Sequence, residues 1–374
     1  MTKVGILATA RQSNGGTLLY TLSMIEALRR LPPQRYACTI YTDHDNHEYD
    51  ALGLPIVRLP GLLRAAFERL LGRRLFDEVD LVIAPVYSMN LLASPRPFAF
   101  TLHDLQEKYL PENFGLATRL WRQLTNRMLT RRAARIVCES NFVKGDIVRF
   151  FGVPEARIAV IPAPPITSLR ESRLDDASLA AVRAKFKLPP QYVFYPAQFW
   201  PHKNHRRLVE AFARVAEAHP ECTLVLTGKK RDEFGRVFER VRELGLSSRV
   251  LHIGYVETSE LAGLYRCATV AAIPTLFESI SIPVYEAFSV GTPVCASNVV
   301  ALPEQVGDAG LLFDPLSVND IADKIGTLLA DSALRTQLTE RGLRRIASIN
   351  HAGYALQLAE LIDSMRGPGR TPTR

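Results

Sequence analysis

The chain has 374 residues, of which 47% are hydrophobic and 22% are charged, and its formal net charge is +8. This length predicts two domains, and the positive charge favours anionic partners. The sequence contains no run of 18 apolar residues and no secretory signal pattern, so we expect neither a membrane-spanning helix nor export.

The first half of the chain predicts a parallel sheet covered by helices. Short apolar runs predict strands over residues 4–9, 38–41, 81–85, 98–102 and 135–139. Helical patterns lie between them, at residues 17–31 and 117–132. Strands that alternate with helices are typical of βαβ units, in which helices cover both faces of a parallel sheet.

Two stretches of this half are basic and amphipathic. Residues 62–75 carry an apolar helical stripe flanked by arginines, and residues 116–138 contain six arginines and no acidic residue. Such helices can lie on an anionic membrane surface. An ordinary surface helix that packs by its apolar face explains the same pattern, and the sequence favours this second interpretation.

The second half repeats the alternation after Pro189 and Pro190. Apolar runs predict strands over residues 192–196, 223–227, 250–253, 269–274 and 293–296. Helical patterns follow at residues 207–219, 232–244, 259–267 and 284–290. The fold class is therefore α/β, with two Rossmann-like doubly wound domains that face each other across a cleft.

Composition shifts set the expected domain boundaries. The first domain is predicted over residues 1–165 and the second over residues 191–352, joined by a linker at 166–190 with a short helix near 176–187. A last helix, at 353–366, could extend back toward the first domain. Residues 367–374 are expected to be disordered.

The segment from Ala271 to Val294 carries the clearest chemistry. An apolar strand ends at Pro274 and is followed by a loop with Glu278; Pro283 then suits the opening of a helix, which places Glu286 in its first turn. The free N–H groups of a helix N-terminus bind phosphate, and carboxylates accept hydrogen bonds from sugar and ribose hydroxyls. This combination suits a nucleotide-sugar.

These two glutamates, with seven residues between them and a Gly-Thr-Pro-Val sequence after the helix, resemble the signature of glycosyltransferase family 4. Further segments resemble that family in the same order along nearly the whole chain: Gly15-Gly16, residues 101–104, 135–144, 158–162, 195–204, 224–228 and 252–256. The resemblance implies the GT-B fold and a retaining, metal-independent transfer from a nucleotide-sugar. The stretch at 200–204 is similar to that of bacterial surface-polysaccharide mannosyltransferases.

The resemblance also implies roles for individual residues. Glu278 would face the donor sugar, Lys203 would neutralise the departing diphosphate, and His103 would lie at the sugar near the acceptor. Glu286 would accept hydrogen bonds from the ribose. Backbone groups would bind the rest of the donor, at Gly15, Gly16, Ser279, Ile280, Ser281 and Val256.

Two positions depart from the family pattern. Gln198 stands where family members usually carry an arginine paired with the lysine, and the usually glycine-rich loop reads Ser-Ile-Ser at 279–281. Loss of one cation weakens the diphosphate site unless another cation substitutes for it, and the candidates are His202, His205 and Arg206. Lys229, Lys230 and Arg231 are interpreted either as a solvated approach to a helix or as a phosphate contact.

Other functions fit the sequence less well. Asp43 and Asp45 form a D-x-D pattern that could hold a divalent ion, but their polar surroundings favour an exposed loop. A nicotinamide oxidoreductase lacks support because residues 9–17 have no G-x-G-x-x-G spacing, and no nucleic-acid-binding motif accompanies the positive charge. A nucleotide-sugar epimerase remains as an enzyme alternative.

The predicted protein is thus a hexosyltransferase, with mannose from GDP-mannose as the leading donor and a UDP-sugar as the alternative. It needs no cofactor and no metal beyond this co-substrate, and its acceptor is a saccharide or lipid-linked saccharide of surface-polysaccharide synthesis. The five scattered cysteines contain no C-x-x-C pair, which fits a reducing cytoplasm. We expect a cytoplasmic protein with peripheral contact at the inner face of an anionic membrane.

Overall fold

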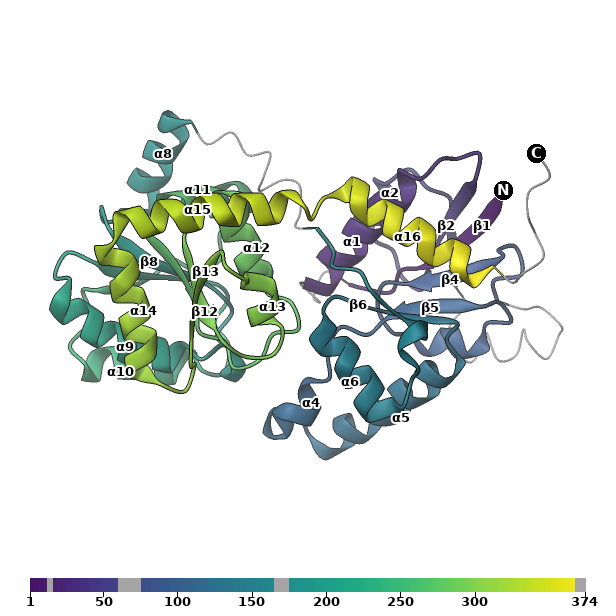
Figure 1. The fold of residues 1–374 in the computed structure, drawn as a ribbon, viewed down its shortest axis with the longest axis horizontal. Coiled ribbons are helices and arrows are strands. Elements are labelled where there is room, and N and C mark those ends of the chain that lie inside the picture. Colours follow the sequence, from purple (N-terminus) through teal and green to yellow (C-terminus); the bar gives the residue numbers. More distant parts are fainter. Residues whose placement is uncertain (12–15, 60–74, 165–174, 367–374) are drawn as a thin grey trace. The chain divides into compact units, whose positions relative to one another are not determined.

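The computed structural model describes residues 1–11, 16–59, 75–164 and 175–366 (Figure 1). They form two compact units: unit 1 comprises Met1–Pro164 and Ile349–Arg374, and unit 2 comprises Pro165–Ser348. Each unit has its own parallel sheet. Among the helices of the described ranges, none combines the length and apolar composition that a membrane span requires.

The sheet of unit 1 has the strand order β3-β2-β1-β4-β5-β6-β7, and every neighbouring pair is parallel. Its strands are β1 (Thr2–Leu7), β2 (Tyr36–Thr42), β3 (Ile56–Arg58), β4 (Leu81–Ala84), β5 (Phe98–Thr101), β6 (Arg135–Cys138) and β7 (Ile158–Val160). The central strands are almost continuous apolar runs, because helices cover both faces of the sheet.

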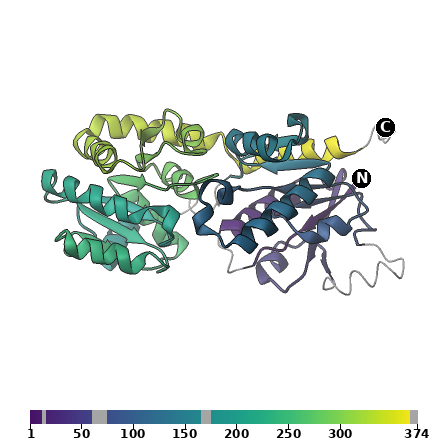
Figure 2. The same cartoon turned by 90° about the horizontal axis from the view of Figure 1, so that it is seen from below.

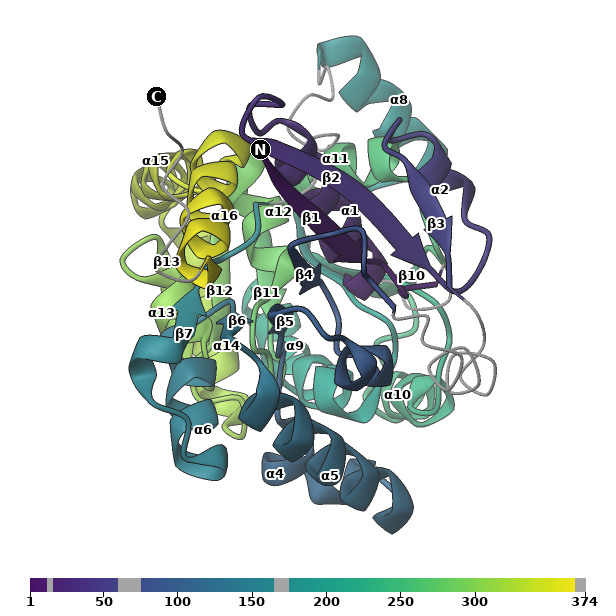
Figure 3. The same ribbon diagram turned by 90° about the vertical axis from the view of Figure 1, so that its right-hand side faces the viewer.

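Helices cover the two faces of this sheet through separate cores. Unit 1 contains α1 (Gly16–Arg29), α2 (His47–Asp50), α4 (Gln106–Tyr109), α5 (Leu116–Arg132), α6 (Asn141–Phe151) and α16 (His351–Met365), with short 3-10 helices at 89–93, 111–113 and 155–157. On one face, α1 packs against the last helix, α16, and they lie side by side in Figures 1 and 3. On the other face, side chains of α5 and α6 complete the core.

The sheet of unit 2 has the order β10-β9-β8-β11-β12-β13 and is also parallel throughout. Its strands are β8 (Tyr192–Pro196), β9 (Thr223–Thr227), β10 (Val250–His252), β11 (Val270–Ile273), β12 (Val294–Ser297) and β13 (Gly310–Phe313). In the register of β8 and β11, Val193 pairs with Val270. The chain first winds outward from β8 and later from β11, so the winding direction reverses between these two strands.

The helices of unit 2 form two groups. They are α8 (Asp176–Phe186), α9 (His205–Ala218), α10 (Phe234–Glu243), α11 (Thr258–Cys267), α12 (Ile282–Ser289), α13 (Leu302–Val306), α14 (Val318–Ala330) and α15 (Ser332–Ala347), with a 3-10 helix, η5, at Pro201–Lys203. In one group α9 contacts both α10 and α14; in the other α11 and α15 contact α12, and α8 contacts α11 (Figure 1). The helix predicted between the domains, α8, therefore packs within unit 2.

The doubly wound α/β class and the ten predicted strands are confirmed, with small shifts at their ends. Three strands were not predicted as such: β3 and β7 at the edges of the first sheet and β13 at the edge of the second. Each has only three or four residues and is partly exposed, so its apolar pattern is weak. The amphipathic helix predicted at 62–75 lies almost wholly outside the described residues.

Candidate active site

Most of the predicted site residues lie on loops that follow the carboxyl ends of strands in unit 2. The loop after β8 carries Lys203, and the loop after β11 carries Glu278. Because the winding direction reverses between β8 and β11, their carboxyl ends border the crevice where ligands bind in sheets of this kind. The topology alone therefore brings these two residues to one place.

Lys203 and Glu278 form an ion pair between Nζ and Oε1, and their side chains are only 18% and 16% exposed. The next residue, Asn204, adopts a left-handed conformation with φ of 59°. Its side-chain amide donates to the carbonyl oxygens of Pro274 and Pro315, each at 2.9 Å. Asn204 thus joins the β8 loop to the start of the β11 loop, beside the ion pair.

Three further hydrogen bonds fix the backbone at residues 202–203. The carbonyl of His202 accepts from the Leu276 amide at 2.7 Å and from the Thr275 hydroxyl at 3.1 Å. The carbonyl of Lys203 accepts from the buried Tyr195 hydroxyl at 3.0 Å. A cation held this firmly needs little reorganisation when charge develops on a ligand beside it.

The second predicted glutamate, Glu286, is buried in α12. Its Oε2 lies 2.8 Å from the hydroxyl of Tyr265, which also lies 3.2 Å from the Pro283 carbonyl. Burial raises the pKa of Glu286 to about 7, and the hydrogen bond from Tyr265 offsets this only in part. The helix begins at Ile282, so Glu286 opens its second turn rather than its first as predicted.

The loop before α12 supplies backbone donors. Within the described chain, no protein acceptor is found for the amide N–H groups of Ser279 and Ile280. The third predicted donor is already engaged, because the Ser281 amide donates to Gln305 Oε1 at 2.7 Å. Gln305 Nε2 in turn donates to the Ser281 carbonyl at 2.7 Å. The predicted contact of Ser281 with the donor stays a prediction, and in the described chain the two amides without a protein acceptor are those of Ser279 and Ile280.

Gln198 and Val256 lie on neighbouring loops of the same edge. Gln198 is half-buried in the loop after β8, and its Oε1 accepts a hydrogen bond from Arg231 Nε at 3.0 Å. Val256 follows β10, in a loop whose Gly254 carbonyl accepts from the Gly228 amide at 2.8 Å. These contacts set the β8, β9 and β10 loops side by side.

Two of the residues considered as substitutes for the missing arginine do not serve as free cations. His205 is 2% exposed, and burial together with the charge of Lys203 lowers its pKa to about 3, so its ring is neutral. Arg206 pairs with Glu210 at 3.3 Å on the exposed side of α9. The third, His202, contributes its backbone carbonyl to the contacts described above.

In unit 1, His103 follows β5 at the carboxyl edge of the sheet. Its Nδ1 lies 3.0 Å from Glu139 Oε2, and its Nε2 lies 2.9 Å from the Pro85 carbonyl. Both partners are acceptors, so both ring nitrogens must carry a proton to satisfy them. Burial alone lowers the pKa of His103, but the hydrogen bond and charge of Glu139 outweigh it and the pKa is raised.

The predicted glycine pair precedes α1. Gly15 lies outside the described residues, and Gly16 is the exposed first residue of the helix. One turn later, the Tyr20 hydroxyl lies 3.1 Å from Thr101 Oγ1, and its ring packs edge-on against His103 with centroids 4.6 Å apart. The start of α1 is thereby tied to the His103 loop.

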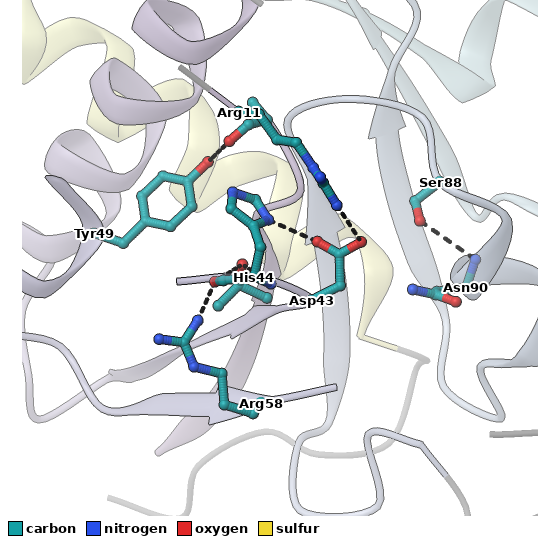
Figure 4. A network of polar contacts seen from close by, with 9 residues as sticks. Arg11, Asp43, His44, Tyr49, Arg58, Ser88 and Asn90 are labelled. Carbon is teal, nitrogen blue, oxygen red and sulfur yellow. Dashed lines mark hydrogen bonds and ion pairs between the residues drawn. The ribbon is translucent and has the colours of Figure 1, made fainter. Parts of the chain in front are cut away.

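The two carboxylates of the D-x-D pattern have different partners. Asp43 lies 2.7 Å from His44 Nδ1 and 4.0 Å from Arg11, as Figure 4 shows. Asp45 is 96% exposed and pairs with Arg58. Arg58 also donates to the His44 carbonyl (Figure 4). Within the described ranges, no group of three or more histidine, cysteine or acidic side chains could hold a metal ion.

The structure adds residues that were not predicted to take part in the site. Glu139 was visible as an acid at the end of a predicted strand. Tyr265 and Gln305 left no signal, because they lie 21 and 24 residues from their partners on other elements.

The sequence matches two family models. The model described as "Glycosyl transferases group 1" matches residues 181–345, and the model described as "Glycosyltransferase Family 4" matches residues 14–164. Together they cover nearly all of the two units.

Individual relatives include several mannosyltransferases. The chain is 29% identical to O-antigen chain mannosyltransferase B of Escherichia coli, over 89% of this chain and 79% of that protein. It is 31% identical to MMP alpha-(1->4)-mannosyltransferase of Mycolicibacterium hassiacum, over 62% of this chain and 57% of that protein. It matches only 31% of the length of serotype-specific mannosyltransferase WbdA of Escherichia coli, at 24% identity over 65% of this chain.

Solved structures share the fold across both units. Anabaena HepE, determined in complex with UDP and glucose, superposes with a TM-score of 0.79 at 18% identity and covers 97% of this chain and 100% of that one. Sucrose-phosphate synthase from Thermosynechococcus elongatus superposes with a TM-score of 0.77 at 22% identity, over 98% and 99% of the two chains.

Proposed function

The chain belongs to the group 1 glycosyltransferases, and on this premise we propose that it transfers mannose from GDP-mannose to a saccharide acceptor, with retention and without a metal ion. One observation carries the proposal. The Lys203–Glu278 ion pair lies at the switch point of the unit 2 sheet, next to the amides of Ser279 and Ile280, which have no acceptor among the residues that the structure describes. This arrangement offers a cation and N–H dipoles to a diphosphate and a carboxylate to a sugar.

The difficult step of glycosyl transfer is the departure of the diphosphate from an oxocarbenium-like sugar. In the proposed reaction, the ammonium of Lys203 and the two free amides stabilise the charge that develops on the leaving phosphate oxygen. Glu278 supports the positive charge near the anomeric carbon. One such preorganised donor contributes about 3–4 kcal/mol of transition-state stabilisation in other anion-stabilising sites.

Retention follows when both events occur on one face of the sugar. The bond between the anomeric carbon and the phosphate oxygen breaks, and a bond from the acceptor oxygen to the same carbon forms on that face. The acceptor's hydroxyl proton passes to the departing phosphate oxygen, so no protein base is required. His103 suits this scheme as a fixed cation rather than a base, because both of its ring nitrogens already donate.

We propose that Lys203 and the two amides take the place of a divalent ion at the diphosphate. Asp43 and Asp45, the pair considered as metal ligands, are each engaged with cations of their own. No cofactor is proposed beyond the nucleotide-sugar co-substrate.

The names of two relatives support mannose as the transferred sugar. A UDP-sugar is the alternative donor, and a nucleotide-sugar epimerase is the alternative reaction. An epimerase would bind the same donor and release it altered at one carbon, with no transfer to an alcohol. The name of the O-antigen relative supports a saccharide acceptor, and we propose that this acceptor is a lipid-linked saccharide of surface-polysaccharide synthesis.

A lipid-linked acceptor requires contact with a membrane, and α5 has the surface for it. Four large apolar side chains of this helix are more than half exposed: Leu116, Leu120, Trp121 and Leu124, at 67%, 59%, 51% and 52%. The helix contains no acidic residue, and Arg119, Arg127 and Arg131 are exposed on it. Seen from below, α5 lies on the near side of unit 1 (Figure 2).

We therefore propose that α5 rests on the anionic inner face of a cytoplasmic membrane, with its apolar residues among the lipid headgroups and its arginines on their phosphates. Basic amphipathic helices bind membranes through both of these terms. The second basic stretch proposed for this role, at 62–75, lies almost wholly outside the described residues.

The reaction is tested with purified protein, sugar-labelled GDP-mannose, bacterial membrane lipids as acceptor and excess chelator. We expect label to enter the lipid fraction in a form that α-mannosidase releases, given the α-configured sugar of the donor. Transfer from UDP-sugars alone would establish the alternative donor. Conversion of the donor to an epimer without transfer would establish the alternative reaction.

A further inference from the structure

The loop after β9 is pressed against the loop that carries Gln198. Gly228 adopts φ of 122°, and a Cβ at this position would lie 2.4 Å from the carbonyl oxygen of Ala197. Only glycine allows so close an approach of two backbones. Hydrogen bonds continue the contact, from the Ala197 amide to the Thr227 carbonyl at 3.1 Å and from the Phe199 amide to the Lys229 carbonyl at 3.4 Å.

This contact places Arg231 on Gln198. Arg231 Nε donates to Gln198 Oε1 at 3.0 Å, and the guanidinium carbon lies 5.0 Å from the centre of the Trp200 ring. The side chain is exposed, and no carboxylate pairs with it within the described chain. Because Nε is engaged and the ring covers one face, the guanidinium plane is held, and within the described chain its two Nη groups have no acceptor.

The other cations of this edge have contacts of their own. Lys203, the first cation of the proposed site, pairs with Glu278, and Arg206 pairs with Glu210. Lys229 lies 5.3 Å from the centre of the Tyr255 ring. Lys230 lies 4.6 Å from the centre of the Phe234 ring, on the side toward α10. The guanidinium of Arg231, by contrast, is held by the loop after β8 that carries Gln198. This loop continues through two consecutive turns to Lys203.

We propose that Arg231 supplies the second cation of the donor diphosphate site, with Gln198 and Trp200 as the residues that position it. This inference rests on the proposed function, because it assigns a further residue to the same donor site. The fork of a guanidinium binds two phosphate oxygens at once, which a lysine cannot do. The cation expected at position 198 is thus provided by the loop after β9. Gln198 accepts a hydrogen bond from this cation and so takes part in the site.

The test is calorimetric binding of GDP and UDP to the full chain and to a set of variants. Arg231→Ala should weaken the binding of the preferred diphosphate roughly tenfold to a hundredfold, while the free nucleoside binds as before. Lys230→Ala removes an equal charge one residue away and should change affinity by less than about twofold. The melting temperature of each variant monitors the fold, which should be unaffected because both side chains are exposed.

Rescue distinguishes a binding role from a merely structural one. Gln198→Arg restores a cation directly at the β8 loop, so the double variant Gln198→Arg/Arg231→Ala should recover affinity to within about threefold of the unmodified protein. If the unmodified protein binds a diphosphate and Arg231→Ala binds it equally well, the inference is wrong and the proposed function stands. If the unmodified protein binds no diphosphate, both are overturned.

Discussion

The buried carboxylate of Glu286 lies 2.8 Å from the hydroxyl of Tyr265, and its pKa is raised to about 7. The hydroxyl has one proton and two acceptors within reach, Glu286 and the Pro283 carbonyl. The hydrogen bond that Tyr265 donates favours the ionised carboxylate, but burial of Glu286 outweighs it and favours the protonated form. A ligand whose hydroxyls donate to Glu286 favours the ionised form instead.

This relationship predicts that donor affinity depends on pH. Binding of GDP-mannose releases the proton of Glu286, so affinity should fall as the pH drops below about 7, by up to about tenfold per unit. The sugar ester is the right probe, because the terminal phosphate of free GDP titrates in the same range. Calorimetry from pH 5.5 to pH 8.5 measures the slope. Glu286→Gln should bind more weakly and with no such slope; an unchanged slope in this variant would assign it to another group.

The same group affects folding stability. The pKa of Glu286 in the folded protein lies above its ordinary value of 4.5, so its contribution to stability is fully present below that value and is lost as the pH rises through about 7. Between pH 5 and pH 8, the melting temperature of the unmodified protein should therefore fall relative to that of Glu286→Gln. A constant difference between the two proteins would contradict this account.

The Lys203–Glu278 pair predicts losses of turnover that are not additive. Lys203→Ala removes the cation at the leaving group and should lower kcat roughly a hundredfold to a thousandfold. Glu278→Gln should also lower kcat strongly, and the double variant should lose less than the product of the two, because each residue positions the other. Arg206→Ala, which removes a nearby charge on α9, is the control and should keep near-normal turnover. If Lys203→Ala and Glu278→Gln both keep near-normal turnover, the proposed site is wrong.

The sequence predicts those site residues that directly follow a recognisable strand. Lys203 and Glu278 follow apolar strands of the unit 2 sheet, and His103 follows one of the unit 1 sheet. Within each sheet, the carboxyl ends of parallel strands meet at one edge. The interior strands themselves were visible because both faces are buried, as in β9 and β11. The edge strand β3 was not, because two of its three residues are exposed.

The supporting contacts could not be foreseen. Gln198 and Arg231 are 33 residues apart in the sequence. Their loops can approach each other because Gly228 has no Cβ. The sequence instead suggested His202, His205 and Arg206 as substitute cations. The structure shows His205 packed between Tyr195 and Phe199, where a charged ring would be too costly.

His103 is predicted to carry a proton on both ring nitrogens, because both of its hydrogen-bond partners are acceptors. Its pKa is raised because Glu139 faces it, with Asp104 and the Pro85 carbonyl adding to the effect of that carboxylate. Glu139→Gln should lower this pKa, so that the variant loses activity at a lower pH than the unmodified protein does. An NMR titration of the His103 ring measures both values. A ring that titrates identically in the two proteins would show that Glu139 does not hold the proton.

The surface of α5 is predicted to bind anionic membranes. The unmodified protein should sediment with vesicles of phosphatidylglycerol and phosphatidylcholine at low salt, and less so at high salt. Removal of two exposed arginines, in Arg127→Ala/Arg131→Ala, should weaken binding by about tenfold to thirtyfold. Arg242→Ala, which removes an exposed charge from α10 of unit 2, should have no effect. Equal binding to neutral and anionic vesicles would contradict the proposed docking surface.

The central claim, that unit 2 binds the diphosphate of a nucleotide-sugar without a metal ion, is tested most directly by a calorimetric screen in excess chelator. GDP, UDP, ADP, their common sugar conjugates and NAD are titrated into the full chain and into Lys203→Ala. The account predicts that one nucleoside diphosphate, GDP before UDP, binds the unmodified protein and binds Lys203→Ala much more weakly. Binding of no diphosphate, or binding that appears only when a divalent ion is added, would contradict it.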